Sequence, residues 1–355
     1  MKGLRLFLSP FAPDDSGAAS VFHALGGLVI ICDAGGCAGN ICGFDEPRWE
    51  TSTARSAVFS AGLRDMDAIL GRDDRLIEKL ETACMQLEPS FAAIIGTPVP
   101  AVIGTDYLGL KRLAEQRLKL PVVTVDTDGT KLYDEGIGKA YLNLFKTFSE
   151  KESSAPNGTV GILGATPLDF PLDAPWENLR QELLAEDWRQ VDIYGIDEGI
   201  ESFRRAGGNS RNLVVSTSGL TAARYLERTF GTPFDIFYPF AAEELKHAID
   251  KSGKMISLDW KKILILHDQF HSNALRQELR QFLPGSLIVC GTWFQQHTKH
   301  AEEQDRHFRE EDEFQMYVRE QDFDCIFADR DFLRAIPFYQ KDFIDLPHFA
   351  VSGSR

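Results

Sequence analysis

At 355 residues the chain is too long for one ordinary hydrophobic core, so two or three domains are expected. Its 43% hydrophobic and 26% charged residues are typical of a folded soluble protein, and no apolar run approaches the roughly 20 residues that span a bilayer. The net charge of −15 argues against nonspecific nucleic-acid binding, because polyanions repel each other. Six cysteines without a recognisable signal peptide favour a reducing compartment, and we expect a cytoplasmic protein.

Short β-type runs alternate with longer amphipathic segments along the chain. Strands are expected at 28–31, 91–95, 121–125, 159–163, 191–194, 213–216, 263–266, 287–290 and 325–328. Helices are expected at 73–86, 107–118, 136–151, 177–186, 221–230, 241–251 and 272–282. This alternation predicts an α/β fold with parallel sheets that carry helices on both faces.

Two polar segments divide this pattern. The segment 149–158 is polar and contains proline and glycine, and a second boundary is expected near 251–254. The chain is therefore predicted to form three Rossmann-like domains, at 1–150, 151–254 and 255–355. Ligands in such folds lie beyond the carboxyl ends of the strands, so chemistry is expected in the turns after residues 31, 95, 163, 216, 266 and 290.

A glycine- and cysteine-rich turn follows the first predicted strand. Cys32 directly follows the apolar run, and Cys37 comes after Gly35 and Gly36, which let the backbone pass close to a large partner. With Cys42, three cysteines fall within eleven residues. In a protein without secretion signals this density suggests iron–sulfur or redox chemistry more than a disulfide framework.

In order and spacing, several segments resemble the nitrogenase component 1 superfamily, which includes cofactor-assembly proteins and dark-operative tetrapyrrole reductases. The resemblance runs over nearly the whole chain, and the segments that carry it are 13–18, 33–37, 63–71, 94–106 and 212–233. It implies three Rossmann-like domains around a central cleft, in an oxidoreductase subunit that takes part in low-potential electron transfer. It also implies a homodimer, or a heterodimer with a cysteine-richer paralogue. An ATP-dependent iron protein would be the electron donor, since this chain has no phosphate-binding loop of its own.

Some residues depart from the pattern of the family. Cluster-bearing relatives typically give three cysteines per subunit to an interfacial cluster. Here Cys37 matches one of these positions, Pro98 takes another, and no cysteine lies near Ser9. The thiolate that anchors the large cofactor of the catalytic subunit aligns with Ser216. Proline cannot ligate iron, and serine does so rarely compared with a thiolate.

Two functions therefore remain open. If two subunits meet on a two-fold axis, Cys37 with Cys32 or Cys42 from each chain supplies four thiolates for a shared [4Fe–4S] cluster. Alternatively these cysteines are inert thiols, and the chain is a cluster-free scaffold that binds a tetrapyrrole or a metallocofactor. The residues expected to contact a cofactor lie on two turns and are Gly35, Gly36, Ser216, Thr217 and Ser218.

A competing motif follows the predicted strand at 121–125. Asp126-Thr-Asp128-Gly-Thr resembles the first motif of haloacid dehalogenase-type phosphatases. There Asp126 would attack phosphorus and Asp128 would act as acid or base, with Mg²⁺ screening the charge. That signature normally opens its domain, whereas about 120 residues of α/β pattern precede it here. The alternative is a turn whose Asp and Gly join a strand to a helix.

The eight histidines give weaker signals. His267, at a predicted strand end, could line a cleft, although a strand-end His beside Asp268 is more often part of a local hydrogen-bonded pair. His348 belongs to a hydrophobic C-terminal segment and is expected to be structural.

Overall fold

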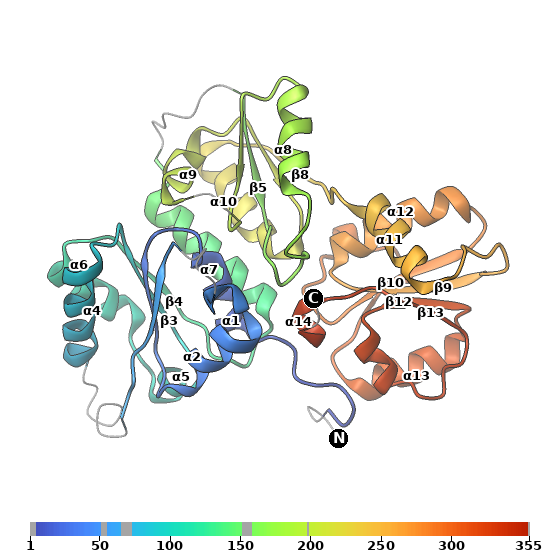
Figure 1. Cartoon of the computed structure of the whole chain (residues 1–355), viewed down its shortest axis with the longest axis horizontal. Helices are drawn as coiled ribbons and strands as arrows, with labels where there is room; N and C mark the ends of the chain where they lie inside the picture. Colours follow the sequence, from blue (N-terminus) through green and yellow to red (C-terminus); the bar gives the residue numbers. More distant parts are fainter. Residues whose placement is uncertain (1–4, 51–54, 65–72, 151–157, 197–198, 354–355) are drawn as a thin grey trace.

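The computed structural model describes residues 5–50, 55–64, 73–150, 158–196 and 199–353. They form three parallel sheets, with strand orders β2-β1-β3-β4, β6-β5-β7-β8 and β11-β10-β9-β12-β13 (Figure 1). The strands are β1 (Leu28–Ile31), β2 (Ala57–Ser60), β3 (Ala92–Ile95), β4 (Val122–Val125), β5 (Thr159–Leu163), β6 (Gln190–Ile193), β7 (Arg211–Val214), β8 (Phe234–Ile236), β9 (Lys262–Leu266), β10 (Leu287–Thr292), β11 (Arg306–His307), β12 (Cys325–Ala328) and β13 (Asp342–Asp345). The predicted α/β fold with parallel sheets is confirmed.

Helices flank each sheet, as the sequence pattern predicts. They are α1 (Asp14–Phe22), α2 (Gly36–Asn40), α4 (Asp73–Leu87), α5 (Pro98–Ile103), α6 (Tyr107–Leu118), α7 (Tyr133–Phe148), α8 (Trp176–Ala185), α9 (Ile200–Arg205), α10 (Leu220–Phe230), α11 (Ala241–Ser252), α12 (Gln269–Phe282), α13 (Glu311–Gln321) and α14 (Phe349–Ser352). Residues 65–71 of the family resemblance and 151–157 of the predicted linker lie outside the described residues. No helix within the described ranges is long and apolar enough to cross a membrane.

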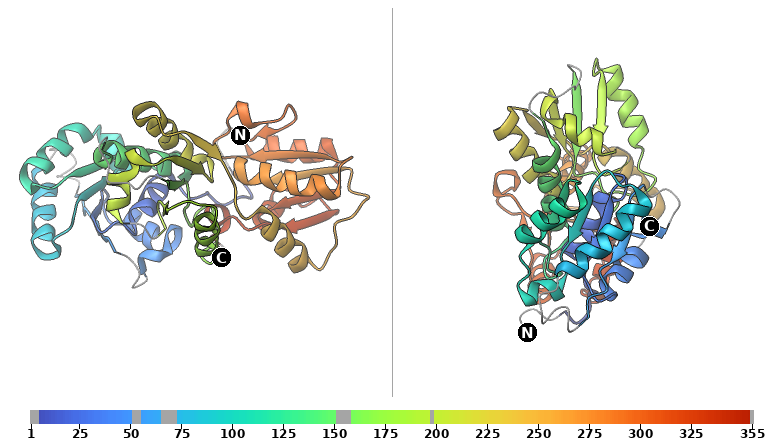
Figure 2. Two further views of the ribbon diagram at one scale, coloured as in Figure 1. Left: turned by 90° about the horizontal axis from the view of Figure 1, so that it is seen from above. Right: turned by 90° about the vertical axis from the view of Figure 1, so that its left-hand side faces the viewer.

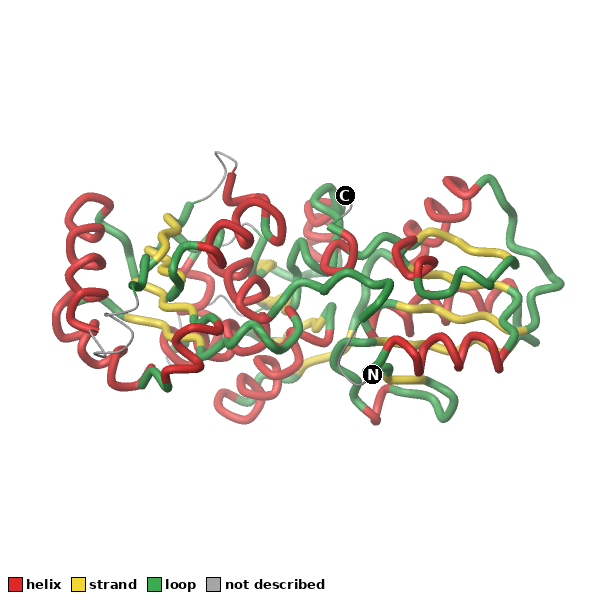
Figure 3. The backbone as a smooth tube through the Cα atoms, turned by 90° about the horizontal axis from the view of Figure 1, so that it is seen from below, coloured by secondary structure: helices red, strands yellow, loops and turns green. Residues whose placement is uncertain are grey.

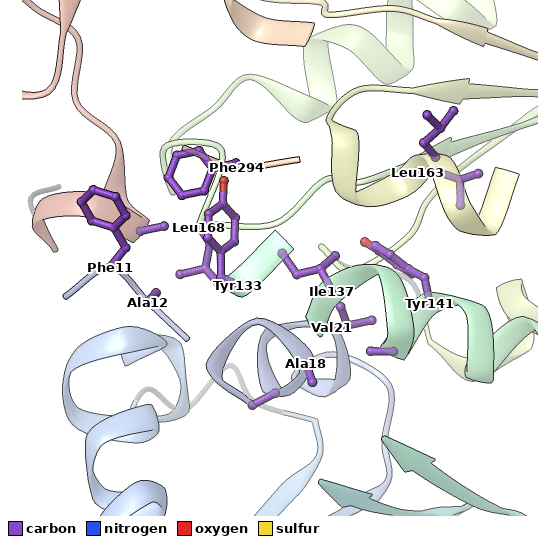
Figure 4. Close-up of a cluster of buried hydrophobic side chains, with 14 of the residues drawn as sticks. Phe11, Ala12, Ala18, Val21, Tyr133, Ile137, Tyr141, Leu163, Leu168 and Phe294 are labelled. Carbon is purple, nitrogen blue, oxygen red and sulfur yellow. The ribbon is translucent and has the colours of Figure 1, made fainter. Parts of the chain in front are cut away.

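Helix α7 joins the first sheet to the second. It packs against α1 and β4 on one side and against α9 and α10 on the other. Two glycines make the crossing with α1 close: an added Cβ on Gly17 would lie 2.0 Å from the carbonyl oxygen of Tyr133, and one on Gly136 would lie 1.8 Å from that of Asp14. Figure 4 shows Ala18 and Val21 of α1 beside Ile137 and Tyr141 of α7. The two helices form part of the largest buried apolar cluster.

The third sheet lies at one end of an elongated molecule, with the first sheet at the other (Figures 2 and 3). An N-terminal segment before α1 reaches it: the ring of Phe11 contacts those of Trp293, Phe294 and Phe332, at centroid distances of 5.8 to 6.1 Å. The backbone N–H of Ala12 donates to Ala350. These contacts bring the start of α7 beside the carboxyl ends of the third sheet.

Candidate functional site

The cysteine turn begins where β1 ends. Cys32 is only 2% exposed and packs in the apolar cluster between the first sheet and α4 and α6. Burial raises the pKa of its thiol to about 12, so the group stays protonated at neutral pH. Its carbonyl oxygen accepts a hydrogen bond from the Thr97 hydroxyl, at 2.6 Å. The surroundings of Cys32 are those of a structural core residue.

Asp33 builds the rest of the turn. Its carboxylate accepts from the backbone N–H of Ala38, at 2.7 Å, and from the Ser60 hydroxyl. Gly35 has a φ of 115°, a left-handed conformation that favours glycine, and an added Cβ on Gly36 would meet nothing within 4 Å. The predicted glycine turn therefore exists and leaves α2 open on one side.

The predicted metal ligands are not gathered into one site. Cys37 is half-buried at the edge of the core, where burial, Asp15 and Asp33 raise the pKa of its thiol. Cys42 is also half-buried, and none of the six cysteines, all of which are described, forms a disulfide. Among the described residues, which include Cys32, Cys37 and Cys42, no group of three or more His, Cys, Asp or Glu side chains could hold a metal ion. The residues of this chain alone therefore do not fit an iron–sulfur cluster.

The loop at Ser216, Thr217 and Ser218 follows β7 and is buried. It meets the turn at Gly164, because the Ser216 hydroxyl donates to the Gly164 carbonyl oxygen at 2.8 Å. The Ser216 and Ser218 hydroxyl oxygens lie 2.6 Å apart. The Ser216 hydroxyl is therefore engaged on both sides within the protein.

Asp268 connects this loop to the third sheet, and Asp169 connects it to α7. Thr217 donates its backbone N–H and its hydroxyl to Asp268, which follows β9 and caps the start of α12. The Ser218 hydroxyl donates to Asp169 at 3.2 Å. Burial together with the negative charge of Asp169 raises the pKa of Asp268, whereas the hydrogen bonds from Thr217 act in the opposite direction.

A buried polar cluster lies where the second and third sheets meet α7. The Tyr133 hydroxyl donates to Asp169 and lies 2.9 Å from Nε2 of His348. The His348 ring stacks on that of His267, with centroids 3.9 Å apart, and Nδ1 of His267 lies 2.8 Å from Nδ1 of His271. This polar cluster joins four segments that are far apart in the sequence.

Sequence reasoning missed most of this cluster. It noted that His267 could line a cleft but favoured a local pair with Asp268, and His348 was expected to be structural. In the structure both imidazoles belong to the polar cluster, and His267 accepts at Nδ1 from the backbone N–H of Asp268. The available signal was their position after β9 and β13, at the carboxyl ends of two parallel strands of the same sheet.

A pocket of about 590 Å³ opens beside the polar cluster. Its walls come from residues 167–175 after β5, from α11 and from residues 345–349 after β13. Proline, leucine and phenylalanine side chains form much of the lining, and Asp169, Glu244 and His271 join it from the polar cluster or its edge. The volume falls in the range of roughly 300–1,000 Å³ that is usual for small-ligand sites.

The two aspartates of the phosphatase-like motif lie elsewhere, on the turn after β4. Asp126 is exposed and lies 3.4 Å from Nζ of Lys139. Asp128 accepts from the backbone N–H and hydroxyl of Thr130, and these bonds lower the pKa of Asp128. Neither aspartate lines the pocket described above.

Comparison with known proteins decides the family. The sequence model of the family called nitrogenase component 1 type oxidoreductase matches residues 16–257, which is more than half of the chain. This chain belongs to the nitrogenase component 1 type oxidoreductase family. The resemblance inferred from the sequence is thereby confirmed.

Relatives and solved structures agree with this assignment. Two nitrogenase iron-molybdenum cofactor biosynthesis proteins NifE are similar: the one from Bradyrhizobium diazoefficiens is 24% identical over 65% of this chain and 40% of its own length. The one from Sinorhizobium fredii is 28% identical over 69% of this chain and 50% of its own length, so this chain spans half or less of these relatives. The structure called nitrogenase Cp1 at pH 6.5 superimposes with a TM-score of 0.73 over 98% of this chain and 87% of its own, at 13% identity. At that identity the likeness concerns the fold alone.

Proposed function

We propose that this chain is a cluster-free, cofactor-binding subunit of the component 1 family that holds a largely apolar organic cofactor in the 590 Å³ pocket. The carrying observation is a contrast between two sites. The cysteine turn offers one buried thiol and two half-buried thiols that do not form a metal-binding group. The pocket, by comparison, is a well-formed concave site with an apolar lining and a few convergent polar groups.

The relatives support a function connected with a cofactor. Two similar proteins are named as nitrogenase iron-molybdenum cofactor biosynthesis proteins. The pocket residues favour an organic ligand, for example a tetrapyrrole. Phe170, Phe240 and Phe349 supply aromatic surface, while no cysteine lines the pocket.

Metal content and ligand binding together test this proposal. Protein purified without oxygen should contain no stoichiometric iron or acid-labile sulfide, and it should bind protoporphyrin IX with a shift of the porphyrin absorption band. Leu172→Trp, at an exposed position of the pocket rim, should weaken that binding about tenfold or more by steric exclusion. Leu184→Trp, on an exposed face of α8 outside the pocket, is the matched control and should bind as the wild type does. Equal binding by the two variants would contradict the site, and no binding by the wild type would contradict the tetrapyrrole class.

A second candidate function places a [4Fe–4S] cluster between two chains, with this chain as one side of an electron-transfer complex that an ATP-dependent iron protein reduces. One observation favours it: apolar side chains are exposed on elements that follow the cysteine turn in the sequence, Phe44 at 73% directly after α2 and Val102 at 86% on α5. Burial of such side chains favours association with a second copy or with a cysteine-richer paralogue. About four irons per dimer, lost in Cys37→Ala, would establish this candidate and overturn the cluster-free one.

A further inference from the structure

Glu244 and His271 form a close pair in the wall of the pocket. Glu244 lies on α11 and His271 on the first turn of α12, and Nε2 of His271 is 2.7 Å from Oε2 of Glu244. The His271 side chain is 4% exposed and that of Glu244 is 19% exposed, so the carboxylate is the member that a pocket ligand can reach.

The hydrogen bonds of His267 determine where the protons of His271 lie. Nδ1 of His267 accepts from the backbone N–H of Asp268 at 2.8 Å, and a backbone amide can only donate. Nδ1 of His267 therefore carries no proton. Since Nδ1 of His271 lies 2.8 Å from the same atom, the proton between the two rings must belong to His271.

His271 thus faces Glu244 with Nε2. In a neutral imidazole that carries its proton on Nδ1, the lone pair of Nε2 would face the lone pairs of the carboxylate, and the two acceptors would repel each other. A second proton on Nε2 removes this repulsion and makes the two groups an ion pair at 2.7 Å, although Nε2 has no hydrogen bond of normal geometry among the described residues. Tyr238 does not supply this proton, because its hydroxyl donates to the two carboxylate oxygens at 2.9 and 2.8 Å. The Tyr238 ring also stacks on the His271 ring, with centroids 4.3 Å apart and planes 5° apart, which favours a positive charge on the imidazole.

The titratable groups around Glu244 and His271 do not take up this proton. Burial and the adjacent imidazoles hold the pKa of His267 well below its ordinary value, so His267 is neutral. The Tyr133 hydroxyl gives its proton to Asp169, so the Tyr133 oxygen accepts from Nε2 of His348, whose Nδ1 has no hydrogen-bond partner among the described residues. On α12 the carboxylate of Asp268 accepts from the backbone N–H groups of Phe270 and His271. On α11 the other titratable residues of the pocket wall are Glu243, His247 and Lys251.

We propose that the Glu244–His271 pair is a proton donor for a neutral ligand base, an sp² nitrogen on an apolar body, that enters this pocket. The proposal rests on the cofactor-binding function proposed above and specifies the chemical class of the ligand. The nitrogen lone pair of the ligand takes the single transferable proton of the pair: this proton passes from Nε2 of His271 through the Glu244 carboxylate to the ligand, and His271 is left neutral with its proton on Nδ1. The ligand gains one positive charge and the pair changes from neutral to −1, so charge is conserved and the carboxylate holds the ligand cation.

Acridine tests the transfer directly, because it is a planar apolar base whose neutral and protonated forms emit at different wavelengths. At a pH where free acridine is neutral, acridine bound to the wild type should emit as acridinium. Glu244→Gln should still bind acridine, with the acridinium fraction reduced about tenfold or more, since glutamine carries no transferable proton. Glu243→Gln is the matched control: it removes the same charge from the same pocket but makes no contact with His271, and should still protonate acridine.

Nitrogen NMR of ¹⁵N-histidine-labelled protein supplies an independent measurement. The wild type should show His271 with protons on both nitrogens, and Glu244→Gln should show a neutral ring protonated at Nδ1. A neutral His271 in the wild type, or acridine bound only in its neutral form, would overturn the proton-donor proposal and leave the cofactor-binding function standing. Absence of acridine binding, with porphyrin binding intact, would overturn the ligand class alone.

Discussion

Asp134, on the first turn of α7, is a buried carboxyl at the junction of the sheets. Its Oδ2 accepts from the backbone N–H of Gln295 at 2.6 Å, while Oδ1 has no hydrogen-bond partner among the described residues. Burial, aided by Asp169 and Asp268, raises the pKa of Asp134 to about 7. The fold therefore favours the protonated form of this side chain.

We predict that Asp134→Asn stabilises the protein more at about pH 8 than at about pH 5. The folded state has the higher pKa, so it binds the proton more tightly than the unfolded chain, whose value is near 3.8. The free energy of unfolding of the wild type therefore falls as the pH rises from about 5 through 7. Asparagine keeps an acceptor for Gln295 and does not titrate, so its relative gain at the higher pH is on the order of 2–4 kcal/mol. Urea unfolding at both pH values measures the gain, and equal differences at the two values would contradict the raised pKa.

The cysteines should differ sharply in reactivity. Cys32, Cys290 and Cys325 are buried, and burial raises the pKa of each thiol, whereas Cys42 and Cys84 are half-buried. Because the thiolate is the nucleophile, we predict that iodoacetamide modifies the native half-buried thiols faster than Cys32 by a factor on the order of 10³. Peptide mass spectrometry after short exposure measures the order. If Cys32 reacted as fast as Cys42, its surroundings would be open enough for metal ligation.

Among the elements, the strands that the sequence pattern did not predict have one property in common. β2, β8, β11 and β13 are all edge strands of their sheets. An edge strand is covered on fewer sides than a central one, so it needs no continuous apolar run, and β8 and β11 are only three and two residues long. The central strands β1, β5 and β12 appear with the predicted bounds because they are buried along their length.

Helix α1 was missed for a different reason. Its sequence contains Ser, Gly and Ala, which give little amphipathic signal, yet every residue from Asp14 to Phe22 is buried. The small side chains are what allow α1 to cross α7 closely, and such tertiary packing is not visible in local periodicity.

The close crossing makes a specific prediction at Gly136. Gly136→Ala should lower the free energy of unfolding by about 3 kcal/mol or more, because its Cβ would lie 1.8 Å from the backbone oxygen of Asp14 and a helix would have to shift. Gly39→Ala, on α2 with nothing within 4 Å of the added Cβ, is the control and should change stability by less than about 1 kcal/mol. Chemical unfolding of the two variants measures the difference. A small loss at Gly136 would mean that the helices lie farther apart.

At the scale of the whole molecule, the polar cluster is a product of topology. Tyr133, Asp169, His267 and His348 come from four separate segments, and no local spacing connects them. The rule that ligands lie beyond strand carboxyl ends predicted the turns after β5, β7 and β9, and these turns do meet. The rule could not show that α7 inserts Tyr133 between them, because that contact depends on how three sheets pack together.

The N-terminal segment connects the two ends of the molecule, and Glu311 holds it. The Glu311 carboxylate, on the first turn of α13, accepts from the backbone N–H groups of Leu6, Phe7 and Leu8 at 3.1 to 3.2 Å. We predict that Glu311→Ala accelerates hydrogen exchange at these three amides by about ten- to a hundredfold, since hydrogen bonds to a charged acceptor contribute roughly 1.5–3 kcal/mol. Glu313→Ala, an exposed carboxylate two residues along the same helix, removes the same charge and should leave these amides unchanged.

Because Phe11 and Ala12 follow this segment and contact the third sheet near His348, the exchange experiment also measures how firmly the third sheet is fixed against α7. Unchanged exchange in Glu311→Ala would mean that the aromatic contacts of Phe11 alone hold the two ends together.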